Sequence, residues 1–329
     1  MRADLALIGL GHVGSRLVQL LDERAARLAA EHDLSCHIAG TATRRHGAAY
    51  EAEPCADAFE LITRLGRSNA DLRIVVEVTT LDVNSGEPAI SHVRAAIAAG
   101  CHVVTANKGP AAFAHAELRD RAARAGVGFL FEGAVMDGVP VFNLVRETLP
   151  AVDVLGFEGV VNTTTNHILT AMESGERFET ALARMQAAGI AEADPSLDLD
   201  GWDAAAKTAA LANVFMDARI TPHDVRRQGL DASTGDEARA ARARGRRLKL
   251  VASARRDEHG ALQCAVEPRE LAADHLLAVL DGGANALILE TDLLDRIAIC
   301  QLAGSLTQTA YALLADVITL SRARGRVSI

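Results

Sequence analysis

A glycine-rich turn near the N-terminus constrains the fold of this 329-residue chain more than any other feature. A short apolar run, Asp4 to Ile8, leads directly into Gly9-Leu-Gly-His-Val-Gly14, and a helical pattern follows from Ser15 to about Ala30. In this strand–turn–helix setting, the glycines permit a tight turn, the close approach of a pyrophosphate and close packing of helix on strand. Phosphates at such a turn meet the free N–H groups of the helix N-terminus. The chain is therefore predicted to open with a dinucleotide-binding βα unit.

Further alternation of apolar runs and helical patterns extends this unit. The length suggests about two domains, and the 49% hydrophobic content is ample for their cores. The predicted fold is α/β: a Rossmann-type doubly wound parallel sheet in residues 1–131, followed by an α+β substrate and dimerisation domain in residues 132–304. A final helix, residues 305–325, is expected to pack back on the first domain.

Composition excludes several classes of protein. No apolar run approaches the roughly 20 residues that a membrane span needs, and the chain enters a strand at once, without a signal-peptide pattern. The five cysteines are scattered, with no CxxC pair, and are interpreted as reduced thiols of a cytoplasmic protein. The formal net charge of −9 argues against nucleic acid as a partner.

An acidic segment that runs into an Ala-rich helix is the strongest chemical signal. Asp203 and Lys207 lie four positions apart at the start of this helix and therefore share one face. The residues that follow, 208–216, are almost wholly apolar, so the helix is expected to be buried. A lysine paired with an aspartate at the mouth of a buried helix is a plausible proton donor and anion anchor.

Two basic positions follow predicted strands of the first domain. Arg44 and Arg45 stand at the end of the second strand, where an acidic residue would be expected for NAD. They favour the 2′-phosphate of NADP, although a solvated loop is the alternative interpretation. Lys108 follows the strand at 101–104, and ligands of doubly wound sheets bind at the carboxyl ends of strands. Lys108 is therefore a candidate site residue.

The second half of the chain reads as mixed strands and helices. A strand at 152–161 is expected to end in the loop Asn162-Thr-Thr-Thr-Asn166, with a helix from His167. The basic segment Arg239–Lys249 is interpreted as a solvated helix end.

Several of these motifs together resemble homoserine dehydrogenase over nearly the whole chain. The matching segments are Gly9–Gly14, Thr105–Lys108, Glu132–Val135 with Gly138–Pro140, Asn162–Leu169, Ala191–Pro195 followed by Asp198, Gly201, Asp203 and Lys207, Ala265–Pro268, and Asn285-Ala286. The resemblance implies hydride transfer between nicotinamide and an amino-acid semialdehyde or its primary alcohol. Within this resemblance, the short length implies the form without a C-terminal regulatory ACT domain. A homodimer is expected by analogy with the family.

The resemblance also assigns residues. It implies that Lys207 is the main proton-transfer or oxyanion-stabilising group, that Asp203 orients it, and that Lys108 assists. Substrate-binding positions are implied at Glu192, Asp198 and Thr164. The expected cofactor-binding positions are Gly9, Gly11, His12, Val13, Gly14, Arg44, Arg45, Thr79, Thr105, Asn107 and Gly304. The family also holds a monovalent cation, Na⁺ or K⁺, through backbone carbonyls that map to Glu132, Val135, Asp137 and Val139.

Three loops depart from the family pattern. Thr163 replaces a glycine, Met136-Asp137 replaces small residues, and Ala303-Gly304-Ser305 shortens a Gly-rich turn. Bulk and lost access to positive φ at such positions would alter a substrate pocket before they altered the reaction type. Two alternatives to homoserine dehydrogenase therefore stay open: a relative acting on another small hydroxy acid, and a nucleotide-binding sensor without turnover.

Overall fold

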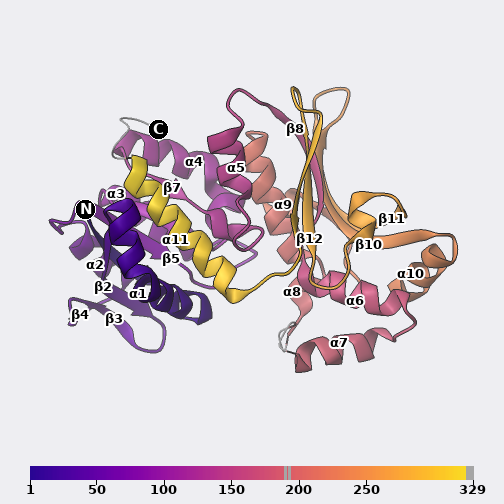
Figure 1. The fold of residues 1–329 in the computed structure, drawn as a ribbon, viewed down its shortest axis with the longest axis horizontal. Coiled ribbons are helices and arrows are strands. Elements are labelled where there is room, and N and C mark those ends of the chain that lie inside the picture. The colour runs from indigo at the N-terminus through magenta and orange to yellow at the C-terminus, as the bar shows by residue number, and fades with distance from the viewer. Residues whose placement is uncertain (189–190, 192–193, 324–329) are drawn as a thin grey trace. The chain divides into compact units, whose positions relative to one another are not determined.

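The computed structural model describes residues 1–188, 191 and 194–323. The chain forms two compact units (Figure 1): Met1–Thr148 together with the C-terminal segment from Ser305, and Leu149–Gly304. The first unit extends beyond residue 131, the boundary expected from the sequence. Glu132 lies in its interior and donates its backbone N–H to the carboxylate of Asp316, 2.9 Å away.

The first unit is built on a seven-stranded sheet of order β4-β3-β2-β1-β5-β6-β7. Its elements are β1 (Arg2–Ile8), α1 (His12–His32), β2 (Ser35–Thr43), β3 (Gly47–Tyr50), β4 (Glu53–Cys55), α2 (Ala58–Leu65), β5 (Leu72–Glu77), α3 (Ala89–Ala98), β6 (His102–Thr105), α4 (Gly109–Ala125), β7 (Phe129–Leu130), η1 (Glu132–Ala134), α5 (Val141–Thr148) and α11 (Leu306–Ala323). The neighbouring strands from β2 through β1, β5 and β6 to β7 all pair in parallel, which confirms the predicted doubly wound sheet. The antiparallel strands β3 and β4, which the sequence analysis did not predict, extend it at one edge.

The glycine-rich turn has the conformation that the motif requires. Gly9 has φ +96°, and a Cβ there would lie 2.6 Å from Val78 O, so no other residue fits without strain. A Cβ at Gly14 would lie 2.8 Å from Gly9 O, which shows how closely α1 packs on the turn that follows β1. Leucines of α1 and α11 then share one apolar core with β1 and β5. Figure 1 shows α11 beside α1 on the same face of the sheet.

The second unit contains a six-stranded sheet of order β13-β12-β8-β10-β11-β9. Its elements are β8 (Val154–Val160), α6 (Thr163–Glu173), α7 (Phe178–Ala187), α8 (Ser196–Leu199), α9 (Trp202–Phe215), η2 (Pro222–Asp224), β9 (Arg226–Arg227), α10 (Thr234–Ala243), β10 (Arg246–Arg256), β11 (Leu262–Ala272), η3 (Leu276–Val279), β12 (Asn285–Thr291) and β13 (Arg296–Gln301). All of its strand pairs are antiparallel except β11 with β9.

Two sequence interpretations of the second unit were wrong. Helix α6 begins at Thr163 rather than at His167, because the Asn162 side chain accepts the N–H of Thr165 and caps the helix. The segment Arg239–Lys249 is not a solvated helix end, since it crosses from α10 into β10. The side chain of Lys249 is 0% exposed.

None of the helices in the described part of the chain is long and apolar enough to span a membrane. All five cysteines are free thiols. Burial raises the pKa of Cys36, Cys101 and Cys264 to about 11, which keeps these thiols protonated at neutral pH.

Candidate functional site

The N-terminus of α1 offers an open position for an anion. Gly11 is the N-cap of this helix, and a Cβ built there would meet nothing within 4 Å. Gly11 and His12 are exposed, Val13 is half-buried, and Gly14 is buried against the strand. Since the first N–H groups of a helix have no intrahelical acceptor, this end of α1 can bind phosphate oxygens.

A buried carboxylate organises the loops at the carboxyl ends of β5 and β6. Glu77 is 0% exposed and accepts hydrogen bonds from the backbone N–H of Thr79, at 3.2 Å, and from the Thr79 hydroxyl. The Thr105 hydroxyl donates to Glu77 O at 2.8 Å and accepts the N–H of Asn107 at 2.9 Å. The Asn107 amide donates to Thr79 O at 3.0 Å. Three expected cofactor positions, at 79, 105 and 107, are thus joined into one network, and Glu77, which the sequence analysis did not single out, lies at its centre.

The basic residues expected near a cofactor lie at different places on the first unit. Lys108 is half-buried and forms the N-cap position of α4, directly after the Asn107 loop. Arg44 and Arg45 are exposed in the turn that joins β2 to β3. Both positions follow the carboxyl ends of strands, where doubly wound sheets bind their ligands.

Lys207 is held by two acceptors in the second unit. Its Nζ donates to Val161 O at 2.6 Å and lies 2.9 Å from Asp203 Oδ2. The side chains of Lys207 and Asp203 are only 13% and 17% exposed. The positive φ of Gly201 turns the chain into α9 just before them. Residues 208–213 of that helix are buried, as its apolar pattern predicted. The predicted i,i+4 pair is therefore formed and largely removed from water.

Asn162 links the two acidic side chains of this cluster. Its amide nitrogen donates to Asp198 Oδ1 at 2.7 Å and to Asp203 Oδ2 at 3.0 Å. Its amide oxygen accepts the N–H and the hydroxyl of Thr165. Asp198, Asn162, Asp203 and Lys207 thus form one continuous chain of polar contacts. The other three residues could be predicted as site residues from the sequence. The role of Asn162 could not, because i,i+4 spacing cannot reveal a bridge between separate segments.

The other positions singled out in the sequence of the second unit lie in different surroundings. Thr164 is 5% exposed in the first turn of α6, beside Asn162. Glu192 lies outside the residues that the structure describes. Thr163 has helical backbone with no positive φ, and its hydroxyl accepts the Asn285 amide at 3.0 Å. Replacing the family's glycine there therefore costs no backbone strain. Gly304 ends the second unit and is exposed.

The loop expected to hold a cation surrounds two buried carboxyl groups. The Glu132 carboxylate accepts the N–H groups of Phe142 and Asn143 at 2.8 and 2.6 Å. Burial raises the pKa of Glu132. Burial, with the nearby charge of Glu132, raises the pKa of Asp316 to about 7 against the effect of a backbone hydrogen bond. Two neighbouring carboxyl groups out of water favour a nearby cation.

The carbonyl groups of this loop are not all equivalent. Val139 O accepts the N–H of Val141 at 2.8 Å, and Asp137 has φ +49° with its carboxylate turned to the Thr309 hydroxyl. Among the described side chains, no three His, Cys, Asp or Glu residues gather as a metal site. A cation here would therefore depend on main-chain oxygens.

Two family models match most of the chain. The model "Homoserine dehydrogenase, NAD binding domain" matches residues 9–132, and "Homoserine dehydrogenase" matches residues 140–318. The first match begins at the glycine-rich turn, and the second contains the Asn162, Asp203 and Lys207 cluster.

Individual relatives of the chain are homoserine dehydrogenases by name. An "NAD(+)-dependent homoserine dehydrogenase" of Pseudomonas canavaninivorans is 36% identical, covering 98% of this chain and 97% of that protein. A homoserine dehydrogenase of Methanocaldococcus jannaschii is 33% identical, covering 96% of this chain and 97% of that protein. The crystal structure of a homoserine dehydrogenase from Thiobacillus denitrificans aligns with a TM-score of 0.87 at 29% identity, covering 99% of this chain and 75% of that one.

Proposed function

Because the chain belongs to the homoserine dehydrogenase family, we propose that it interconverts homoserine and aspartate 4-semialdehyde by hydride transfer with a nicotinamide cofactor. The chain is an oxidoreductase acting on a CH–OH group. One observation supports Lys207 as the centre of its chemistry: an ammonium group, largely buried, is held between Val161 O and Asp203. Such an ammonium can act on an oxygen whose charge changes during reaction.

In the proposed step, a hydride and a proton together reduce the aldehyde to the primary alcohol. When bound, nicotinamide supplies the hydride to the aldehyde carbon, and the carbonyl oxygen becomes an alkoxide. Lys207 donates a proton to that oxygen, which gives the primary alcohol, and the reverse direction returns the proton to the amine. Asp203 orients Lys207 through their ion pair, and Asn162 fixes the Asp203 carboxylate through a 3.0 Å hydrogen bond. Lys108 assists in polarising the substrate oxygen.

Acidic and hydroxyl groups serve substrate binding. Asp198 and Glu192 are proposed to hold the ammonium and hydroxyl of the amino acid, because carboxylates are the natural partners of a cation. Thr164, beside Asn162 in α6, contributes a hydroxyl. The hydrogen bond from Asn162 to Asp198 supports this assignment, since it fixes a carboxylate within the Lys207 cluster.

A substrate panel tests the function. The purified chain is assayed for nicotinamide reduction with homoserine and with other hydroxy amino acids and small hydroxy acids. We expect the highest kcat/KM with homoserine. A higher kcat/KM with another compound would support the different-substrate alternative. Cofactor binding without turnover of any compound would support a sensor.

Cofactor choice is the finer part of the proposal. We propose that NADP is preferred, because Arg44 and Arg45 stand in the exposed turn after β2. NAD stays the alternative, since the Pseudomonas canavaninivorans relative is named as NAD(+)-dependent.

Removing both arginines tests whether they select NADP over NAD. In Arg44→Ala/Arg45→Ala, we expect KM for NADP to rise about tenfold or more, the scale of one lost charge-assisted hydrogen bond, with KM for NAD nearly unchanged. Initial rates with each cofactor provide the measurement. Arg67→Ala, at an exposed arginine between α2 and β5, is the matched control and should affect neither. An equal change for both cofactors would remove the arginines from 2′-phosphate recognition.

A monovalent cation is proposed at the loop formed by Glu132, Val135, Asp137 and Val139. The buried carboxyl groups of Glu132 and Asp316 support it electrostatically. Na⁺ or K⁺ should raise the melting temperature relative to tetramethylammonium at equal ionic strength. Identical melting curves in the three salts would argue against the site.

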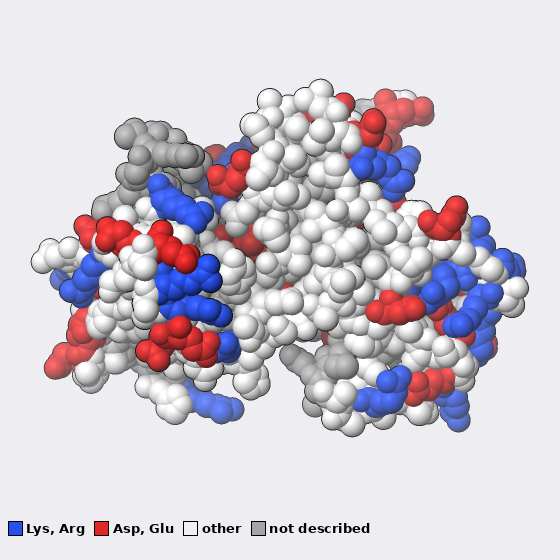
Figure 2. Space-filling view, viewed as in Figure 1, with Lys and Arg blue, Asp and Glu red and all other residues white. Residues whose placement is uncertain are grey.

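We further propose a homodimer. Leu155, Leu293, Leu294 and Leu302 of the second unit are 49%, 66%, 45% and 82% exposed. Figure 2 shows a broad area without charged side chains over the sheet of this unit. Contiguous exposed apolar surface often marks a protein interface. Sedimentation equilibrium should give twice the chain mass, and a monomer at micromolar concentration would contradict the proposal.

The cytoplasm is the proposed location of the reaction. Five free thiols, three of them with a pKa raised by burial, are typical of a reducing compartment. Fractionation of source cells should recover the activity with the cytosol, and recovery outside it would contradict this assignment.

A further inference from the structure

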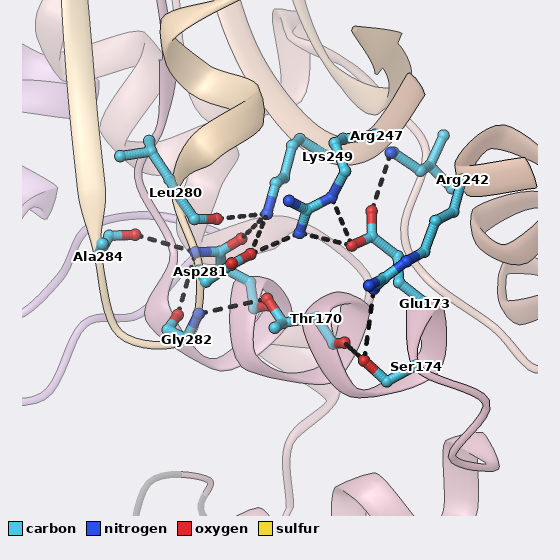
Figure 3. Close-up of polar contacts among 12 residues, drawn as sticks. Thr170, Glu173, Ser174, Arg242, Arg247, Lys249, Leu280, Asp281, Gly282 and Ala284 are labelled. Carbon is cyan, nitrogen blue, oxygen red and sulfur yellow. Dashed lines mark hydrogen bonds and ion pairs between the residues drawn. The ribbon is translucent and has the colours of Figure 1, made fainter. Parts of the chain in front are cut away.

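Lys249 on β10 is a fully buried cation that the proposed chemistry does not use. Its Nζ donates to Asn166 Oδ1 at 3.0 Å and to Leu280 O, and lies 3.6 Å from Asp281 Oδ1. Figure 3 shows Lys249 and Arg247 side by side, both directed toward Asp281. Burial, followed by the charge of Arg247, lowers the pKa of Lys249. Placing an ammonium out of water costs several kcal/mol unless acceptors replace the solvent.

Lysine is rare in this chain. The chain has 34 basic residues, but its only lysines are Lys108, Lys207 and Lys249. Arginine supplies all of the remaining basic charge. Two of the three lysines already have proposed roles in the reaction.

Lys249 controls an amide that fastens a loop to α6. While Asn166 Oδ1 accepts from Lys249, Asn166 Nδ2 donates to Gly282 O and to Ala284 O, both at 3.0 Å. Since Lys249 can only donate, it fixes which end of the Asn166 amide faces the loop. Lys249 also donates to Leu280 O, so the loop is held at both ends.

The same loop reaches the first turn of α6. Next to Ala284, the Asn285 amide donates to the Thr163 hydroxyl at 3.0 Å. A Cβ at Gly283 would lie 3.2 Å from His167 Nε2, so the loop lies directly on the helix. The first turn of α6 is therefore clamped at Thr163 and Asn166, one helical turn apart.

That turn begins at the cap residue of the Lys207 cluster. Asn162 precedes Thr163 and donates to Asp203 Oδ2, which lies 2.9 Å from Lys207 Nζ. Displacement of the turn would shift Asn162, and a shift of the order of 1 Å at a positioning group can cost about 10²-fold in rate.

We propose that Lys249 is a positioning residue of the substrate site: by orienting Asn166 and the loop at 280–285, it holds the first turn of α6, and with it Asn162 and Thr164, in place against Asp203. This inference rests on the proposed function.

The adjacent Arg247 provides a matched control. Its guanidinium pairs with Glu173 Oε2 at 2.6 Å and with Asp281 Oδ1. Glu173 is at the opposite, C-terminal end of α6. Loss of Arg247 therefore removes ion pairs to the buried Glu173 and the exposed Asp281, but it leaves the hydrogen bonds of Lys249 to Asn166 and to Leu280 O in place.

Lys249→Met and Arg247→Met are compared in the full-length protein. We expect Lys249→Met to lower kcat/KM for homoserine about 10- to 100-fold, the scale of a lost hydrogen bond to a charged group, with an unchanged dissociation constant for the cofactor. Arg247→Met should lower the melting temperature by an amount comparable to Lys249→Met, while its kcat/KM stays within about twofold of the value for the parent protein. Equal losses of kcat/KM in both variants would overturn the proposal, because they would report destabilisation alone.

Hydrogen exchange supplies a readout that does not need turnover. In Lys249→Met, amides of residues 164–167 should exchange at least about tenfold faster, whereas in Arg247→Met the faster exchange should occur near Glu173. Unchanged exchange at 164–167 in Lys249→Met would overturn the positioning role, even if the parent protein turns over homoserine. If the parent protein has no homoserine activity but Lys249→Met still exchanges faster at residues 164–167, the positioning role is supported. Only the proposed function is then contradicted.

If Lys249→Met does not fold, a milder variant tests the contact between the loop at 280–285 and the first turn of α6. Thr163→Val keeps the shape of the side chain but removes the acceptor for Asn285. It should raise KM for homoserine about threefold or more, the scale of one neutral hydrogen bond. Unchanged kinetics would show that this loop does not position the first turn of α6.

Discussion

In the Lys207→Ala variant, we expect kcat for homoserine to fall at least about 10²-fold, the usual contribution of a general acid–base group. The ammonium of Lys207 is held by Val161 O and Asp203 in a cluster that is largely out of water. Alanine can neither take up the proton that the homoserine hydroxyl releases nor stabilise the alkoxide that forms there. Steady-state rates at saturating cofactor provide the measurement.

The control for this variant is Asp200→Ala. Asp200 is exposed and stands three positions before Asp203, so its loss changes local charge without touching Lys207. We expect kcat to change less than twofold. If Lys207→Ala also kept near-normal kcat, Lys207 would not be the proton-transfer group.

The second large effect is expected at the glycine-rich turn, where two glycines should respond differently. Gly9→Ala should lower the free energy of unfolding by about 3 kcal/mol, because Ala is strained at φ +96° and its Cβ would lie 2.6 Å from Val78 O. Gly11→Ala should leave stability unchanged, since Gly11 has φ −77° and open space around it. Its methyl group should still weaken cofactor binding about tenfold or more, because a pyrophosphate approaches the backbone there.

Urea unfolding and calorimetric titration separate the two variants. A stable Gly9→Ala protein would contradict the strained geometry of the turn. Full cofactor affinity in Gly11→Ala would show that phosphates bind elsewhere.

The parts of the fold that could be predicted depend on local signals. Strand β1, the glycine-rich turn and α1 could be predicted together because each glycine has a local steric reason. The i,i+4 pair of Asp203 and Lys207 could be predicted from helical spacing alone. The resemblance to the family then identified the reaction type, which the family matches support.

Features that depend on tertiary partners could not be predicted. The start of α6 was placed too late because the sequence does not show that the Asn162 side chain caps it. Lys249 looked like part of a solvated basic run, since its acceptors, Asn166 Oδ1 and Leu280 O, come from distant segments. Glu77 was overlooked for the same reason, because the groups that it accepts from come from two segments, Thr79 after β5 and Thr105 at the end of β6.

Thr163 shows why a departure from a family motif needs structural context. Loss of a glycine there suggested strain in the substrate pocket. In the structure, Thr163 is an ordinary helical residue whose hydroxyl accepts from Asn285. The departure therefore adds a contact, which is consistent with retention of homoserine as substrate.

The central claim is that the Lys207 ammonium acts in the hydride-transfer step itself. Single-turnover formation of reduced cofactor, with homoserine carrying hydrogen or deuterium at the reacting carbon, isolates that step. The account predicts that Lys207→Ala slows this phase at least about 10²-fold, with a clear deuterium isotope effect and unchanged cofactor affinity. A single-turnover rate equal to that of the parent protein would contradict it.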